Sequence, residues 1–157
     1  MKKYILGSFL LLIGTISLIF SLSLQDAPTS NTLSQKATEV MASVIEINPD
    51  PLTSIPPISN NLVRSMAHVG LFFILGCISL LTCTLCHMGY KKSLFFTLLL
   101  GMLTAFCDEL IQLSSAGRAF EWSDLGKDLF GIICSLILFS ILYLFVQSLH
   151  LLNTKES

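Results

Sequence analysis

The sequence has little charge for its length. Of its 157 residues only 12% are Asp, Glu, Lys or Arg, whereas 53% are hydrophobic. A soluble domain usually carries about 25% charged residues. With so few polar side chains, a water-soluble globule of this size would be unable to cover its surface. The composition therefore excludes an ordinary soluble domain and predicts an integral membrane protein.

The net charge and the positions of the cysteines narrow the class of protein further. The net charge is −1, so the chain lacks the basic surface that nucleic-acid binding requires, and we expect no nucleic-acid partner. The five cysteines all lie inside apolar segments. This placement argues against the disulfide framework of a small secreted scaffold.

Four apolar segments are long enough to cross a membrane. A hydrocarbon core of about 30 Å takes about 20 apolar residues in a helix, and in lipid the backbone must bond to itself. The predicted spans are residues 4–24, 62–86, 93–113 and 125–147. They predict an all-α integral membrane bundle of four transmembrane helices. The first, within residues 1–24, is too long for the apolar core of a signal peptide and lacks an A-x-A cleavage site, so we expect an uncleaved anchor.

A long segment, residues 25–61, connects the first two spans. Residues 33–47 within it place apolar side chains on one helical face. They predict a short amphipathic helix that either lies on the membrane surface or packs on the bundle. Thr32 and Gln35 have the spacing of a capping box at its start. The prolines that follow predict an extended connector over residues 48–61.

The basic residues near the span ends predict the orientation in the membrane. On one side lie Lys2, Lys3, Lys91, Lys92 and Lys155. On the other side lie Lys36, Arg64, Arg118 and Lys127. We take the first side as cytoplasmic and expect a multi-pass cell-membrane protein with both termini in the cytoplasm. Residues 62–147 then form a three-helix core, and residues 148–157 form a cytoplasmic tail.

One short motif suggests a cofactor but does not fit this topology. Cys83 to His87 match the C-x-x-C-H pattern of haem attachment. They fall at the cytoplasmic end of a span, whereas haem attachment requires an oxidising face outside the cytoplasm. We therefore expect no cofactor.

The little charge that is present is crowded into one stretch. Seven of the nineteen charged residues lie between Cys107 and Asp128, flanked by two segments without charge. At about 1.5 Å per residue, Asp108 lies roughly 24 Å along the third span, near its outer end. The polar residues of the second and fourth spans lie at the same depth. We predict a polar site on the outer face, formed by Arg64, His68, Asp108, Glu109, Gln112, Arg118, Asp124 and Asp128.

The spacing of these residues supports an inward-facing site. Three pairs are four positions apart and so share a helix face: 64 with 68, 108 with 112, and 124 with 128. A charge facing lipid near the membrane centre costs about 2.5–3.5 kcal/mol or more, so the pairs should face the bundle interior. We expect Arg64 or Arg118 to form an ion pair with one of the four carboxylates.

The same residues resemble a known family. The motifs are RSMAH at residues 64–68, LG at 75–76, DELIQL at 108–113, GR at 117–118 and DLGKDLFG at 124–131. Together and in this order they resemble the VanZ-like family, membrane proteins associated with teicoplanin resistance. The resemblance implies a four-span plan but no established reaction. The chain differs at Val69, Leu71 and Phe72, where members often have Phe, Glu and Tyr, so a role of that Glu or Tyr is absent here.

Three functions are compatible with these residues. In the first, the site binds the headgroup of a membrane lipid or a lipid-linked cell-wall precursor, because Arg64 and Arg118 suit phosphate or carboxylate. In the second, a hydrolase of a lipid-linked substrate uses His68 and the carboxylates for metal binding or acid–base chemistry. No recognised catalytic motif supports an enzyme, so we assign no catalytic residue and no metal ligand. In the third, the charges only fix helix packing, to which interhelical polar bonds contribute about 0.6 kcal/mol each.

Overall fold

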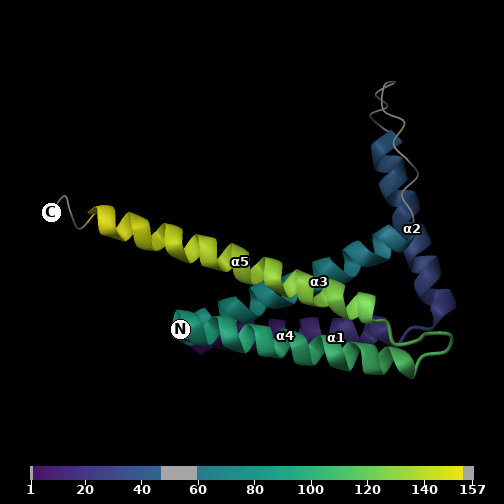
Figure 1. The fold of residues 1–157 in the computed structure, drawn as a ribbon, viewed down its shortest axis with the longest axis horizontal. Helices are drawn as coiled ribbons and strands as arrows, with labels where there is room; N and C mark the ends of the chain where they lie inside the picture. The colour runs from purple at the N-terminus through teal and green to yellow at the C-terminus, as the bar shows by residue number, and fades with distance from the viewer. Residues whose placement is uncertain (1, 47–59, 154–157) are drawn as a thin grey trace.

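The computed structural model describes residues 2–46 and 60–153, and in these residues all regular secondary structure is α-helical, with no strand (Figure 1). The predicted connector over residues 48–61 lies almost wholly outside them. The helices are α1 (Lys2–Ser23), α2 (Ala27–Glu46), α3 (Asn60–Leu85), α4 (Tyr90–Leu113) and α5 (Trp122–Asn153).

Four of the helices have the length and composition of membrane spans. These are α1, α3, α4 and α5, whose apolar segments run for 22, 25, 24 and 28 residues. The predicted all-α fold with four long apolar helices is therefore confirmed. The observed α5 is longer than the predicted span of residues 125–147. It begins at Trp122, with Asp124 in its first turn, where a carboxylate stabilises the positive end of the helix dipole.

The amphipathic helix of the connecting segment is present but begins earlier than residue 33. The side chain of Asp26 accepts a hydrogen bond from the backbone N–H of Thr29, at 3.1 Å, and so caps α2. Thr32 lies one turn inside the helix, where its hydroxyl donates to the carbonyl of Thr29. The capping-box interpretation of Thr32 was wrong because Asp26 already caps the helix. Figure 1 shows α2 running transverse to the bundle at one of its ends.

The bundle is held together by close contact between α3 and α5. Both helices begin at the end of the bundle next to α2 and cross each other (Figure 1). At Gly131 of α5, an added Cβ would lie 2.4 Å from the carbonyl oxygen of Val69 in α3. Only glycine permits the two backbones to approach this closely. The fully buried apolar core lies beside this crossing and consists of Ile19, Phe72, Leu75, Ala105 and Ile132.

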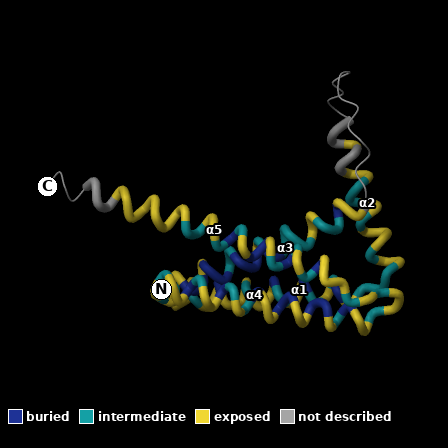
Figure 2. The backbone as a smooth tube through the Cα atoms, in the orientation of Figure 1, coloured by how far each residue is buried: buried dark blue, intermediate teal, exposed yellow. Residues whose placement is uncertain are grey.

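The outer faces of the helices remain apolar and exposed. Figure 2 shows burial concentrated where the helices meet, with exposed positions along the outside of α1, α4 and α5. Large side chains such as Leu10, Phe95 and Leu144 are more than half exposed. Contiguous apolar surface of this extent is covered by lipid in a membrane bundle. The fold is thus that of a multi-pass membrane protein.

Candidate functional site

The polar residues of the spans gather at one end of the bundle, where α1 and α4 end and α3 and α5 begin. The structure brings all eight predicted site residues to this end. Five of them are buried almost completely, namely Asp108, Glu109, Gln112, Asp124 and Asp128. Burial of so many polar and ionisable side chains requires partners, which come from α1, α3, α4, α5 and the turn between α4 and α5.

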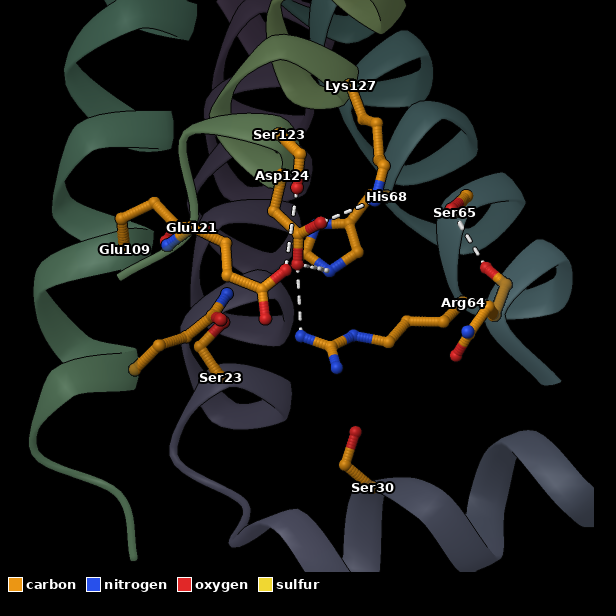
Figure 3. A network of polar contacts seen from close by, with 12 residues as sticks. Ser23, Ser30, Arg64, Ser65, His68, Glu109, Glu121, Ser123, Asp124 and Lys127 are labelled. Atoms are coloured by element: carbon orange, nitrogen blue, oxygen red, sulfur yellow. Dashed lines mark hydrogen bonds and ion pairs between the residues drawn. The ribbon is translucent and has the colours of Figure 1, made fainter. Parts of the chain in front are cut away.

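Asp124 is the acceptor for two cations (Figure 3). Its Oδ2 lies 3.0 Å from Nη2 of Arg64, and its Oδ1 lies 2.6 Å from Nζ of Lys127. The imidazole Nε2 of His68 is 3.8 Å from the same Oδ2. The predicted ion pair between an arginine and a carboxylate of the site is therefore confirmed. Lys127 was not among the predicted site residues, although its position three residues after Asp124 places it on the same helix face.

A second contact joins the next turn of the same two helices. Nδ1 of His68 lies 2.9 Å from Oδ1 of Asp128, and the imidazole is only 13% exposed. The pairs Arg64–Asp124 and His68–Asp128 each follow from residues four apart on α3 and α5. The contact with the Asp128 carboxylate holds the ring of His68 in one orientation.

Asp108 connects α4 to α1. One of its carboxylate oxygens accepts a hydrogen bond from the Ser23 hydroxyl, and the other accepts one from Nε2 of Gln112 at 2.9 Å. Ser115 donates in turn to the backbone carbonyl of Ser23, at 3.0 Å. Sequence reasoning missed Ser23, because a serine at the end of an apolar helix is common and indicates no partner 85 residues away.

Glu109 supports the turn between α4 and α5. It is fully buried, and its Oε2 accepts a hydrogen bond from the backbone N–H of Glu121 at 2.9 Å. Its partner is thus the backbone rather than an arginine. This contact fixes the turn that leads into Asp124 and so helps to place the acceptor of Arg64.

Arg118 lies in the same turn, outside the membrane spans. Gly117 before it has a positive φ of 75°, a left-handed conformation that glycine adopts without strain. Burial lowers the pKa of Arg118, and the like charge of Arg64 lowers it further, while nearby carboxylates act in the opposite direction. Among the residues that the structure describes, no carboxylate oxygen lies within 4.0 Å of the Arg118 guanidinium.

Both arginines face a small cavity. The cavity measures about 140 Å³, and its polar lining includes Arg64, His68, Asp108 and Arg118. Its remaining walls are mostly apolar side chains of α1, α2 and α3, among them Ile19, Leu22, Leu33, Leu71 and Phe72. A neighbouring cavity of about 250 Å³ is also lined by Arg64 and Arg118. The arrangement therefore combines two cations with an apolar wall, which suits an anionic group attached to an apolar chain.

Fold and site together define a multi-pass helical membrane protein with a buried Arg/His/Asp cluster at one end of its bundle. The sequence model of the VanZ/LLP1 family matches residues 8–143. The chain belongs to this family, as the motifs between residues 64 and 131 had indicated. The match extends beyond those motifs on both sides and includes most of α1. Searches of curated proteins and of solved structures found no significant match.

Proposed function

We propose that the polar end of the bundle binds the anionic headgroup of an envelope lipid or of a lipid-linked cell-wall precursor. The observation that carries this proposal is the unpaired Arg118 beside Arg64 at an apolar-walled cavity. A guanidinium donates two parallel hydrogen bonds to phosphate or carboxylate, which makes arginine well suited to such headgroups. Arg118 is available for this purpose because no described carboxylate is within ion-pair distance.

The size and lining of the cavity support a headgroup rather than a whole lipid. Pockets that enclose drug-sized ligands measure about 300–1,000 Å³, whereas this cavity measures about 140 Å³. The headgroup would occupy the cavity while the chain of the ligand lies along apolar residues such as Leu22 and Leu33. The exposed apolar side chains of α2, including Val40 at 63% exposure, suit a helix that rests on the membrane surface over this site.

The distribution of lysines supports placing this end of the bundle at the outer leaflet. Envelope precursors and glycopeptide drugs meet there, and the resemblance to teicoplanin-associated proteins accords with this placement. In this proposal, the chain protects a precursor by occupying its headgroup. Expression in a sensitive host would therefore raise the teicoplanin concentration needed to stop growth, and the Arg118→Ala variant would not.

The test is direct binding to purified protein. The probes are short-chain phosphatidylglycerol, undecaprenyl phosphate and, as a zwitterionic comparison, short-chain phosphatidylcholine. The variants are Arg118→Ala and, as a matched control, Lys92→Ala at the opposite end of the bundle. A charge-assisted hydrogen bond contributes about 1.5–3 kcal/mol, so Arg118→Ala should weaken binding of an anionic probe by about 10–100-fold.

Each outcome decides between the competing functions. Tighter binding of one anionic probe, lost in Arg118→Ala but retained in Lys92→Ala, supports the headgroup site. Equal binding of all three probes, or binding that ignores Arg118, contradicts it and leaves helix packing as the role of the charges. Turnover of the bound probe would instead favour the hydrolase.

A further inference from the structure

The buried carboxylates at the polar end exceed the cations that reach them. Among the described residues, the Arg and Lys side chains that form ion pairs are those of Arg64 and Lys127, and both bond to Asp124. The bonded partners of Asp108 are neutral, namely Ser23 and Gln112. Asp128, a full turn further along α5, bonds to His68 alone among the described residues. An uncompensated carboxylate in a dry interior is strongly unfavourable, so it either takes up a proton or binds a cation.

The geometry of three of these groups suits a metal ion. His68, Asp108 and Asp128 each offer one donor atom, and these atoms lie within 4.8 Å of one another. In a tetrahedral site with bonds of about 2.0–2.2 Å, the donors would lie about 3.3–3.6 Å apart. The donor atoms would therefore have to approach one another by up to about 1.5 Å to complete the site. The three donors come from three different helices, α3, α4 and α5.

A separate observation supports a ligand at this position. Oδ2 of Asp128 is buried without a hydrogen-bond partner, although the residue has no solvent exposure. Oε1 of Gln112, whose amide nitrogen holds Asp108, is also buried without a partner. Buried oxygens without a partner are rare in native proteins, and a bound ion or an ordered water is one explanation for them. The other oxygen of Asp128 already contacts His68, so Oδ2 is the oxygen of this carboxylate that is available to bind a metal ion.

We propose that His68, Asp108 and Asp128 bind one divalent metal ion beside the cavity. One imidazole and two carboxylates favour Zn²⁺ or Mn²⁺ over Ca²⁺, which takes six to eight oxygen ligands. His68 and Asp108 also line the cavity between α1, α2 and α3, so the ion has a route from solvent. The site rests on its own three residues and does not depend on headgroup binding.

The experiment measures metal binding by the full-length protein in detergent, without added lipid. The protein carries an affinity tag free of histidine, is stripped with EDTA, and is then titrated with Zn²⁺ or Mn²⁺. The bound metal per chain is determined by elemental analysis after desalting, and bound Mn²⁺ is followed by electron paramagnetic resonance. We expect one ion per chain, and a higher temperature of unfolding when the ion is present.

Two variants and their controls locate the site. Asp128→Asn and His68→Ala should each weaken binding at least tenfold, since even residues that only orient a ligand contribute about 10–100-fold. Glu39→Gln, on the exposed face of α2, and His87→Ala, exposed at the other end of α3, are the matched controls and should bind as the wild type does.

Wild-type protein that takes up neither metal would overturn the proposal, whatever the variants do. Binding that survives in His68→Ala and Asp128→Asn would overturn it as well. A variant that fails to fold is replaced by Asp108→Asn, and the wild-type titration decides the question in any case. Loss of lipid binding in Arg118→Ala with metal uptake intact would separate this site from the proposed headgroup site.

Discussion

Arg64 of α3 lies 3.0 Å from the carboxylate of Asp124 in α5, a residue 60 positions later in the chain. The next pair on these helices, His68 and Asp128, has the same separation in sequence. Two successive turns of α3 thus match two successive turns of α5. The register of this helix pair is fixed by polar bonds at the end of the bundle and by the contact at Gly131 further along.

Removal of the shared acceptor should destabilise the protein. The Asp124→Ala variant leaves Arg64 and Lys127 without their carboxylate, and each is about two thirds buried. We expect a loss of about 1–3 kcal/mol in the free energy of unfolding, less than for a fully buried pair because water still reaches both cations. Thermal unfolding in detergent measures it, with Glu39→Ala as the control. Equal unfolding temperatures for the two variants would contradict the role of Asp124.

The two arginines should respond differently to the same substitution. Arg64→Ala breaks an ion pair to a buried carboxylate and should lower the unfolding temperature. Arg118→Ala removes a side chain that has no ion pair among the described residues, so its effect on stability should stay within about 0.5 kcal/mol. The comparison uses the same unfolding measurement for both. A larger loss of stability in Arg118→Ala than in Arg64→Ala would show that Arg118 is structural.

A methyl group at the crossing of α3 and α5 should be poorly tolerated. The Cβ of Gly131→Ala would meet the backbone of Val69 at 2.4 Å, and a backbone atom cannot rotate away. Such overpacking costs about 1–3 kcal/mol. Gly126→Ala, in the same helix with nothing within 4 Å of the new Cβ, should be neutral or stabilising by up to about 1 kcal/mol. If both variants unfold at the same temperature, the helices are not in this close contact.

The orientation of the bundle can be tested with fusions. We expect a reporter that is active only outside the cytoplasm to be silent when fused after Ser157. The same reporter fused after Asp50, beyond α1, should be active, because α1 carries the chain across the membrane. Activity of the fusion after Ser157 would place the polar end on the cytoplasmic face and exclude a headgroup site in the outer leaflet.

The start of α2 should depend on pH. Hydrogen bonds from the Thr29 hydroxyl, and from its backbone N–H, lower the pKa of Asp26. The cap is therefore complete at neutral pH and is lost as the pH falls through this lowered pKa. Amide hydrogen exchange, corrected for intrinsic rates, should show less protection in the first turn of α2 in acid. Asp26→Asn should remove most of that pH dependence, and an unchanged profile would argue against the cap.

Hydropathy and helix periodicity predicted much of this structure. Twenty or more apolar residues in a row have no stable form in lipid other than a helix, which explains why all four spans were found. Residues four apart face the same way, so Arg64 with His68 and Asp124 with Asp128 indicated two matching helix faces. Depth along each span then predicted that these faces meet at one end.

The particular bonds could not be predicted, because they depend on contacts between distant segments. Asp108 bonds to Ser23 of α1 and to its own neighbour Gln112, while Glu109 bonds to a backbone N–H. Their predicted depth makes these two acids and Asp124 equally good candidates for an ion pair with an arginine. Which acid forms the ion pair depends on the rotation of each helix about its axis, and the sequence pattern determines this rotation only to within a side chain or two.

The length of α5 has a consequence for the bilayer. Its apolar segment of 28 residues is about 42 Å long, against about 30 Å of hydrocarbon, whereas the 22 residues of α1 nearly match that thickness. Tilt is one way to relieve such a hydrophobic mismatch, and Figure 1 shows α5 diverging from α4 toward its C-terminal end. Polar bonds therefore join the helices at the polar end of the bundle, whereas α5 diverges from α4 at the other end. A thinner or thicker bilayer would change the inclination of the diverging C-terminal part of α5. The polar end, with Arg64 and Asp124, would stay in place.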